Sequence, residues 1–375
     1  MTDTSQRAQR IVILLDDFRA GGVERVAISL ANAWRRGGRD VTLLCGVDDG
    51  PLRQRVAPGV TVVPLRRPIP YSSVSAIRLG WAYARALNRL PTEVVFAPGN
   101  SHLPSIGVIA RLQPRRRRVL ACKLSNRLYR DARSRAAQRT FLMAAHFWSA
   151  PLDGVVAMSP NLQQEARRAL RRNDICAIWE ACVADDVVPV MQPPAANQTP
   201  TVVVAGRLAA EKNVGLALQA FRLLARHADT RLQIIGDGPL RSALTDQARQ
   251  LGIEERIEWS GHVDDIRPYL AHASALLSTS DYEGYPAVLI EALAAAVPVV
   301  TTDSSPAVPE ILFDPSFGIV APRTPEALAD ALTRAFSLRP EPSALAMLVA
   351  RHRVDHSARA YLAWFDRLWC QRREQ

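Results

Sequence analysis

The sequence predicts two Rossmann-like α/β domains in tandem, and three observations lead to this prediction. The chain has 375 residues, of which 48% are apolar and 22% charged, enough for two domains with separate cores. Short apolar runs typical of buried parallel strands alternate with helical stretches, and this alternation occurs twice. The two series are separated by residues 187–200, a segment rich in proline and small polar residues that is typical of a linker.

The first series predicts an N-terminal domain over residues 1–186. It begins with a strand over residues 11–17, followed by a glycine turn and by an amphipathic helix that ends at Gly37 and Gly38. A second strand over residues 41–47 completes a βαβ unit, the start of a doubly wound sheet. Further strands are expected at residues 61–65, 93–98, 118–124 and 154–159.

The second series predicts a C-terminal domain over residues 201–354. A strand over residues 201–206 precedes an amphipathic helix over residues 213–227, and a last helix is expected over residues 325–338. Between these helices, strands are expected within residues 231–239, 256–261, 274–280, 298–303 and 317–322. Residues 355–375 contain large apolar side chains and predict a helix that packs back toward the N-terminal domain. Because such domains bind ligands at the carboxyl ends of their strands, we expect a cleft for two substrates between them.

Cysteine content and hydropathy favour a cytoplasmic, soluble protein. The five cysteines are scattered and form no Cys-x-x-Cys motif, which argues against a disulfide framework and a thiolate zinc site. The first ten residues are polar, so no signal peptide is expected. No apolar run approaches the ~18 residues that a membrane-spanning helix needs.

The positive charge of the chain is concentrated in its first half. The net charge is +11, with +14 over residues 1–190 and −3 over residues 191–375. A run of four arginines, Arg115 to Arg118, precedes an apolar and aromatic stretch over residues 141–148. No aromatic residues interleave the run and no nucleic-acid-binding module is recognised, so nucleic acid is not an expected partner. A solvated face is the simplest interpretation, and an anionic membrane surface, with peripheral attachment, is the functional alternative.

One candidate anion site lies in the loop Gly206–Asn213, immediately after a predicted strand. Lysine occurs only at Lys123 and Lys212 in a chain that otherwise uses arginine, and Lys212 lies five residues after Arg207. An Arg fork and a Lys point charge beside a helix N-terminus would hold a diphosphate. Surface charge is the alternative interpretation of this pair.

A second candidate site is the segment from Ser280 to Ala292. Glu283 is followed by Gly284, Tyr285 and Pro286, and Glu291 lies within a predicted helix that begins near Ala287. Glycine lets the backbone approach a ligand, and a helix N-terminus favours negative charge. Carboxylates in this setting accept hydrogen bonds from vicinal hydroxyls such as those of sugars and ribose. A capped helix with an exposed acid is the alternative.

These motifs, in this order and spacing, resemble the glycosyltransferase group 1 family, which are retaining enzymes of the GT-B fold. The resemblance rests on GRLAAEKN, IIGDGP, SGHV and SDYEGYPAVLIEALAAAVPVVTTD within residues 201–330, and on AGGVERV near the N-terminus. It implies transfer of a sugar from a nucleotide-sugar donor to a lipid-linked or saccharide acceptor, in polysaccharide or lipopolysaccharide assembly. It implies no cofactor.

The resemblance also assigns roles to individual residues. Arg207 and Lys212 match the pair that holds the donor diphosphate, and Glu283 matches the glutamate that binds the donor sugar; these three are the expected catalytic residues. The remaining donor-binding positions are Gly22 in the N-terminal loop, Val263 beside the base, Gly284, Tyr285 and Pro286 at the sugar or phosphate, and Glu291 on the ribose. On the acceptor side we expect His102, which follows a predicted strand, and Asn126.

Several positions depart from the family's pattern. Ala296 replaces a common glycine, Pro306-Ala307 replace a Ser-Gly pair, and Glu180-Ala181 replace an Asn-Pro pair. The family's N-terminal catalytic histidine has no clear match, and Lys123, Ser125 and Asn126 occupy that region. The segment Asp281-Tyr282-Glu283 superficially resembles a metal motif, but Arg207 and Lys212 would neutralise a diphosphate without a metal, so none is expected.

The departures leave other functions open. A relative that binds nucleotide-sugars without turnover and a sugar-nucleotide epimerase of the same fold are the alternatives to a glycosyltransferase. A phosphorylase is disfavoured because it would need a lysine for pyridoxal phosphate, and the chain has only two.

Overall fold

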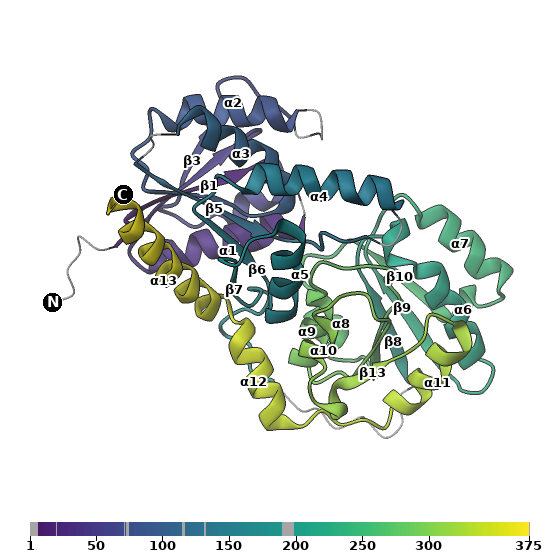
Figure 1. Ribbon diagram of the computed structural model, residues 1–375. Helices are drawn as coiled ribbons and strands as arrows, with labels where there is room; N and C mark the ends of the chain where they lie inside the picture. The colour runs from purple at the N-terminus through teal and green to yellow at the C-terminus, as the bar shows by residue number, and fades with distance from the viewer. Residues whose placement is uncertain are drawn as a thin grey trace. The chain divides into compact units, whose positions relative to one another are not determined.

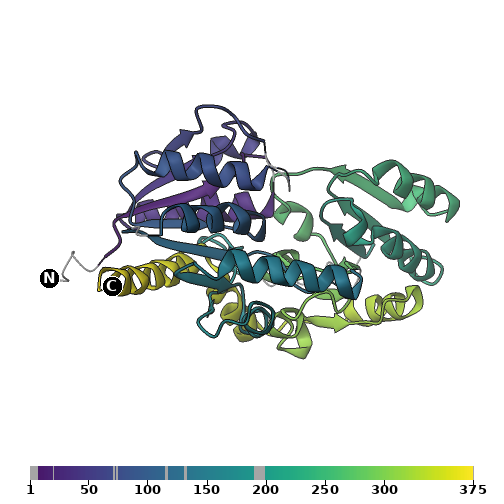
Figure 2. The same cartoon turned by 45° about the horizontal axis from the view of Figure 1, so that its top comes forward.

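The computed structural model describes residues 7–19, 21–70, 72, 75–114, 117–130, 133–189 and 199–374. The chain forms two compact units (Figures 1 and 2). Unit 1 comprises the chain up to Ala181 together with the part from His352 onward, and unit 2 comprises Cys182–Arg351. Each unit is a parallel sheet with helices, which confirms the predicted α/β class. Most of the predicted linker, residues 190–198, and Arg115 and Arg116 of the arginine run lie outside the described residues.

The sheet of unit 1 has seven strands in the order β3-β2-β1-β4-β5-β6-β7. The strand order reverses between β1 and β4, the point at which doubly wound sheets bind ligands. The predicted strands are present, and the two-residue β7 is an addition that its length hides from periodicity. The strands are β1 Arg10–Leu15, β2 Asp40–Cys45, β3 Thr61–Pro64, β4 Val94–Ala97, β5 Val119–Leu124, β6 Gly154–Ala157 and β7 Cys176–Ala177.

Helices follow the strands of unit 1 in the alternation that the sequence predicts. Among them α4 is capped by the side chain of Ser134 and α5 by that of Ser159, both of which accept from the first helical turn. The helices are α1 Gly22–Arg36, η2 Pro51–Arg55, α2 Ala76–Leu87, η3 Asn100–His102, α3 Leu103–Leu112, α4 Arg135–Ser149 and α5 Pro160–Leu170.

The last helix of the chain, α13 Val354–Arg373, belongs to unit 1 and supplies part of its core. Tyr361 and Phe365 pack edge to face against Trp34 of α1, with ring centroids 5.8 and 5.2 Å away. Phe96 of β4 lies against the same rings, and Trp34 donates a hydrogen bond to the carbonyl of Ala358. Aromatic contacts of this kind add to the stabilisation from burial alone. One face of the unit 1 sheet is therefore closed by two helices more than 300 residues apart.

The sheet of unit 2 has six strands in the order β10-β9-β8-β11-β12-β13, so its order reverses between β8 and β11. The strands are β8 Thr201–Ala205, β9 Arg231–Ile235, β10 Ile257–Gly261, β11 Ala275–Ser278, β12 Val299–Thr301 and β13 Gly318–Val320. All of them were expected from the sequence, to within a few residues at each end.

The helices of unit 2 include three that the sequence predicts, α6, α9 and α11, and one that it did not indicate, α12. They are η4 Ala210–Lys212, α6 Val214–Leu224, α7 Arg241–Gln250, η5 Glu254–Arg256, α8 Arg267–Leu270, α9 Ala287–Ala294, α10 Val308–Ile311, η6 Pro315–Phe317, α11 Pro325–Ala335 and α12 Pro342–His352. Within the described part of the chain, no helix is both long and apolar enough to span a bilayer.

Ala296, which follows α9, adopts a left-handed backbone conformation with φ of +57°. This conformation places Cβ close to the following carbonyl and costs roughly 1–2 kcal/mol for an L-residue. The family commonly has glycine at this position. This chain has alanine there but keeps the backbone conformation that favours glycine.

Candidate active site

The loops that follow β8 and β11 meet at the reversal point of the unit 2 sheet. These loops are Gly206–Asn213 and residues 279–286, the two segments that the sequence singled out. Asp281 N–H donates to the carbonyl of Glu211 at 2.9 Å, and Asn213 Nδ2 donates to Asp281 Oδ1 at 3.0 Å. Thr279 Oγ1 donates to the carbonyl of Asn213 at 2.9 Å. Segments about 70 residues apart are thus held as one structure.

Lys212 and Glu283 are in direct contact in this structure. Lys212 Nζ lies 2.5 Å from Glu283 Oε1, which also accepts a hydrogen bond from Ser280 Oγ at 2.7 Å. The side chains are 25% and 13% exposed, so the pair is partly open to solvent. The structure therefore brings together one residue expected at the diphosphate and one expected at the donor sugar.

Arg207 is the most exposed of the expected catalytic residues. Its side chain is 69% exposed, and Nη2 donates to Glu211 Oε1 at 2.5 Å, four residues further along the chain. Gly206, immediately before it, has φ of +146°. Gly236, after β9, has φ of +133°, and a Cβ there would lie 1.9 Å from the carbonyl oxygen of Gly206. Glycine is required at Gly236 because the two strand ends approach so closely.

The loop after β12 supports the Glu283 segment. The carbonyl of Ser304 accepts from Glu283 N–H at 2.8 Å, and Ser305 Oγ donates to the carbonyl of Gly284 at 3.0 Å. Arg323 Nη2 donates to the carbonyls of Asp281 and Asp303. The sequence analysis missed these supporting residues, because a hydroxyl or guanidinium that bonds backbone leaves no periodic or spacing signal.

The remaining donor-binding candidates also follow strands of unit 2. Gly284, Tyr285 and Pro286 are buried, and Pro286 lies immediately before the first residue of α9. Glu291 is half-buried on α9, as the predicted helix requires. Val263 lies half-buried just after β10, two strands away from β8 in the sheet.

The candidates of unit 1 gather where β1, β4 and β5 end. Gly22 is the first residue of α1, and a Cβ added there would meet no atom within 4 Å. Asn126 N–H donates to Asn100 Oδ1 at 3.3 Å, and Asn100 Nδ2 donates to the carbonyl of Asn126 at 2.8 Å. A Cβ on Gly99 would lie 2.8 Å from Ser125 Oγ, so these strand ends are tightly apposed.

His102 is fully buried, and its ring lies against a carboxylate that the sequence analysis did not single out. Its Nε2 is 3.5 Å from Asp16 Oδ1, and Asp16 is 6% exposed directly after β1. Burial lowers the pKa of His102, while Asp16 opposes that change. Burial raises the pKa of Asp16, opposed by His102. Both shifts favour the neutral forms of the two groups.

Lys123, the other lysine of the chain, forms a buried ion pair. Its Nζ lies 2.6 Å from the carboxylate of Glu180, and the side chains are 2% and 9% exposed. Lys123 is on β5, and Glu180 follows β7. Two departures from the family pattern are therefore partners of each other in the folded chain.

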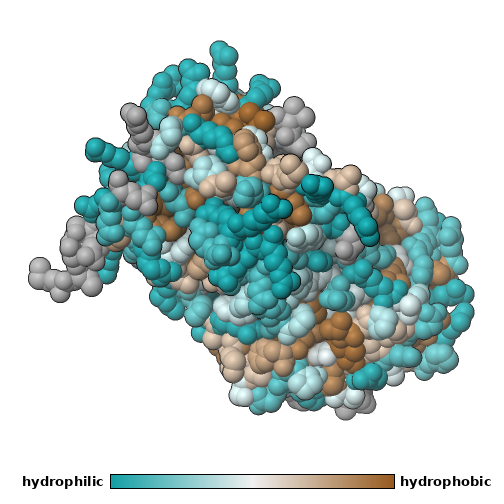
Figure 3. Space-filling model, in the orientation of Figure 1, coloured by the Kyte–Doolittle hydropathy of each residue, from teal (hydrophilic) through white to brown (hydrophobic). Residues whose placement is uncertain are grey.

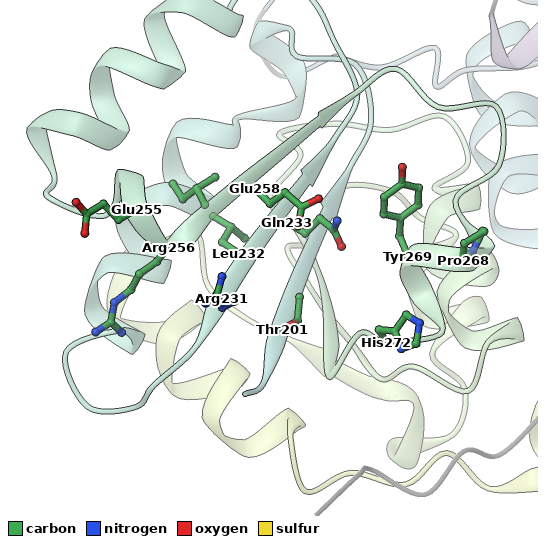
Figure 4. A pocket seen from close by; sticks show the side chains of 11 residues that line it. Thr201, Arg231, Leu232, Gln233, Glu255, Arg256, Glu258, Pro268, Tyr269 and His272 are labelled. Carbon is green, nitrogen blue, oxygen red and sulfur yellow. The ribbon is translucent and has the colours of Figure 1, made fainter. Parts of the chain in front are cut away.

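A hollow of about 630 Å³ lies elsewhere on the unit 2 sheet (Figure 4). Arg231 and Gln233 of β9, Glu258 of β10, and Tyr269 and His272 near α8 line it. It includes Thr201 and Arg231, the first residues of their strands, whereas the donor candidates follow the strands' last residues. This hollow is therefore distinct from the candidate active site.

The side chains of the possible metal motif Asp281-Tyr282-Glu283 are engaged in contacts within the protein. In the described ranges, no three His, Cys, Asp or Glu side chains gather as a metal site would require. The Asp281 carboxylate accepts from Asn213 instead, and Glu283 is held by Lys212 and Ser280.

Comparison with known families shows to which family the chain belongs. The family "Glycosyl transferases group 1" matches residues 191–347, and "Glycosyl transferase 4-like domain" matches residues 21–178. The chain belongs to the group 1 glycosyltransferases. This assignment confirms the resemblance found in the motifs, and the two matches together cover both units.

Curated relatives of this glycosyltransferase family member share only part of their length with it. An exopolysaccharide phosphotransferase of Streptomyces coelicolor is 32% identical over 186 residues, 49% of this chain and 19% of the relative. The N-acetylgalactosamine-N,N'-diacetylbacillosaminyl-diphospho-undecaprenol 4-alpha-N-acetylgalactosaminyltransferase of Campylobacter jejuni is 33% identical over 115 residues, 31% of each chain. A lipopolysaccharide 1,6-galactosyltransferase of Salmonella typhimurium is 28% identical, covering 40% of this chain and 42% of the relative. The chain spans less than half the length of these relatives.

Solved structures resemble the whole chain. Anabaena Alr3699/HepE in complex with UDP and glucose superposes with a TM-score of 0.76 at 18% identity, covering 94% of this chain and 98% of the other. The lipopolysaccharide outer core galactosyltransferase WaaB superposes with a TM-score of 0.70 at 18% identity, with the same coverage. At this identity the likeness establishes the GT-B fold.

Proposed function

We propose that the protein is a retaining glycosyltransferase that moves a sugar from a nucleotide-sugar to a lipid-linked or saccharide acceptor, in polysaccharide or lipopolysaccharide assembly. The contact between Lys212 and Glu283 carries the proposal. In this proposal Lys212 binds the diphosphate and the adjacent Glu283 binds the sugar, at the reversal point where such sheets bind ligands. Relatives named as glycosyltransferases of undecaprenol-linked sugars and lipopolysaccharide support the acceptor class.

The chemistry follows from the charges of the site. As the bond from the sugar to the diphosphate breaks, negative charge grows on the leaving phosphate, and Lys212 and Arg207 stabilise it. No enzyme nucleophile is needed when the acceptor hydroxyl attacks from the face that the phosphate leaves, with the phosphate oxygen accepting the proton. In this mechanism Glu283 holds the donor sugar by its hydroxyls, and Glu291 holds the ribose. Transfer is expected to continue in the presence of EDTA, because cationic side chains neutralise the diphosphate.

Paired glutamine variants test the assignment. Glu283→Gln removes the charge that would face the sugar, so kcat should fall while affinity for a nucleoside diphosphate stays the same. Glu291→Gln should weaken nucleoside diphosphate and nucleotide-sugar alike, because both contain ribose. Calorimetry with the diphosphate and a transfer assay give the two readouts, and NMR of the anomeric signals tests retention. Binding without turnover by the wild-type protein would support a non-catalytic relative instead.

We also propose that unit 1 attaches to an anionic membrane surface through a face formed by α2, α3 and α4. The segment 76–149, which contains these helices, has 14 Lys and Arg residues, one of them the buried Lys123, and two acidic ones. Trp81 on α2 and Phe147 on α4 are 53% and 51% exposed. Arg111 stacks over the ring of Phe147 with its guanidinium carbon 3.8 Å from the centroid. Figure 3 shows brown hydrophobic side chains between teal hydrophilic ones in the region of α2. Basic and exposed aromatic side chains together suit an interface with anionic lipid.

Vesicle sedimentation tests the membrane proposal. Binding to vesicles with anionic lipid should exceed binding to neutral vesicles and should fall as salt rises, because charges are screened over ~8 Å at physiological ionic strength. Trp81→Ala should weaken binding. Met347→Ala is the matched control, because Met347 is an exposed hydrophobic residue of unit 2, 60% exposed. Equal sedimentation with neutral and anionic vesicles would favour a solvated face.

A further inference from the structure

The hollow on the unit 2 sheet lies over a sheet face that carries polar side chains (Figure 4). Leu232 of β9 belongs to the hydrophobic core of the unit, and Ile257 of β10 packs against that core. The next residue of each strand, Gln233 and Glu258, faces the opposite side, and the two are neighbours in the register of β9 and β10. Parallel strands are normally apolar on both faces because helices cover both. This part of the sheet face therefore departs from the pattern of a covered parallel sheet.

The side chains around the hollow have hydrogen-bonding groups without partners in the protein. Figure 4 shows Gln233 and Glu258 on the strands and Tyr269 and His272 near α8, on opposite sides of the hollow. Within the described part of the chain, four side chains of the lining form no hydrogen bond or ion pair, namely those of Arg231, Glu258, Tyr269 and His272. The hollow has a volume of about 630 Å³, which is in the range of small-molecule sites. These groups therefore surround a space large enough for a small ligand.

The lining is balanced between donors and acceptors and between positive and negative charge. The guanidinium of Arg231 only donates hydrogen bonds, the carboxylate of Glu258 only accepts them, and the hydroxyl of Tyr269 does both. Arg231 and Glu258 have opposite charges, as do Glu255 and Arg256 at the edge of the hollow. A lining of this kind gives no net attraction to a phosphate or to a cation. It suits a neutral molecule with several hydroxyls, since each hydroxyl both donates and accepts.

Tyr269 also supplies an aromatic surface to the hollow. It is half-buried on the four-residue helix α8. The face of an aromatic ring is electron-rich and attracts the positive edges of other groups, such as the C–H groups on one side of a pyranose. A sugar ring combines this C–H surface with hydroxyls, so it matches both parts of the lining.

We propose that this hollow binds a saccharide that is not the sugar being transferred, at a site separate from the donor site. The lining includes Thr201 and Arg231, the first residues of β8 and β9, whereas the donor candidates follow the last residues of the strands. The five residues of β8 span about 13 Å, which exceeds the width of one sugar ring. The inference goes beyond the proposed function, because it does not depend on which sugar is transferred.

Histidine NMR detects this contact without any need for turnover. In protein labelled with ¹³C-histidine, the ring signal of His272 is the one that is lost in His272→Gln. The probes are maltotriose, cellotriose, mannotriose, chitotriose and the anionic trigalacturonic acid, each titrated at constant pH with and without a nucleoside diphosphate. At least one neutral probe should shift the His272 signal with saturation. Its affinity should stay within twofold when the nucleoside diphosphate is present, because the two sites are separate.

Two variants and a matched control make the outcome decisive. Tyr269→Ala and Glu258→Gln should each weaken binding of that probe about tenfold, through loss of the ring contact and of a hydrogen bond to a charged group. Glu258 is exposed, so Glu258→Gln keeps the test valid if Tyr269→Ala fails to fold. Glu326→Gln is the control and should leave the affinity within twofold, because Glu326 is an exposed glutamate of α11 outside the lining.

Three results would overturn the inference. The first is a His272 signal that no neutral probe moves, or equal affinity of the probe for wild type and Glu258→Gln. The second is tighter binding of trigalacturonic acid than of every neutral trisaccharide, which would contradict a site for neutral sugars. The third is loss of the shift when the nucleoside diphosphate is added, which would assign the sugar to the donor site. Absence of sugar transfer by the wild-type protein would count against the proposed function alone.

Discussion

The two lysines of this chain form the same ion pair in two different surroundings. Lys123 meets Glu180 in unit 1 at 2.6 Å, and Lys212 meets Glu283 in unit 2 at 2.5 Å. The first pair is almost inaccessible, whereas the Lys212 side chain is 25% exposed. Water cannot replace either residue of the buried pair, so the removal of one residue leaves the charge of the other buried and uncompensated. A partly exposed pair at a strand reversal can release either member to a ligand. The comparison teaches that exposure, and not chemical type or distance, separates a structural lysine from a candidate binding lysine.

The largest effect is expected from breaking the buried pair. Lys123→Met leaves the Glu180 carboxylate buried without its partner, which should lower the free energy of unfolding by about 3–5 kcal/mol. The double variant Lys123→Met, Glu180→Leu should recover most of that loss, because no isolated charge remains. Urea unfolding of both single variants and the double variant measures the coupling. A loss under about 1 kcal/mol in Lys123→Met would show that water already reaches the pair.

The corresponding change in unit 2 should affect binding rather than folding. Lys212→Ala should change the free energy of unfolding by less than about 1 kcal/mol, because the pair is partly exposed. Affinity for a nucleoside diphosphate should fall by about 10-fold to 100-fold, the value of a hydrogen bond to a charged group. Calorimetry measures the affinity, and Arg249→Ala on the exposed face of α7 controls for the loss of one positive charge. Unchanged affinity in Lys212→Ala would remove it from the donor site.

The buried histidine extends the comparison to a group that titrates. Because burial lowers the pKa of His102 below 6.5, the unfolded chain binds this proton more readily than the folded chain. Stability should therefore be lost as pH falls below about 6.5 toward the lowered value, by up to about 1.4 kcal/mol per pH unit. Asp16 acts in the opposite sense, since its raised pKa makes the folded chain bind its proton first, at more acidic pH.

Urea unfolding between pH 5.5 and 7.5 isolates this contribution when wild type is compared with His102→Gln. The variant should show the shallower dependence on pH, whatever its absolute stability, because the other six histidines are common to both proteins. Identical slopes would mean that His102 gains its proton as easily in the folded state as in the unfolded state.

The smallest effect is expected at Ala296, which follows α9 and has a left-handed backbone conformation. Ala296→Gly should raise the free energy of unfolding by about 0.5–1 kcal/mol, because relief of the left-handed strain exceeds the entropy cost of glycine. Ala295→Gly is the matched control, since its φ of −91° suits alanine and its replacement should destabilise. Thermal unfolding of the two variants should thus give shifts of opposite sign, and shifts of the same sign would contradict the strain.

The sequence was sufficient to locate most strands and the two loops that form the candidate donor site. Buried parallel strands are continuous apolar runs, so β8 and β11 and the loops that follow them could be located. The two-residue β7 is too short for any period, and the proline-initiated α12 carries few distinguishing signals. Pairs such as Lys123 with Glu180, and Asp16 with His102, could not be predicted. Their members are 57 and 86 residues apart, and only the order of strands brings them together.

The placement of α13 in unit 1 has a consequence for folding of the chain during its synthesis on the ribosome. Domains generally fold in order of synthesis. In this chain Trp34 and Phe96 pack against Tyr361 and Phe365, which are translated after all of unit 2. The second unit can therefore fold while the first still exposes this aromatic surface. The core of unit 1 can be completed only after α13 has been synthesised.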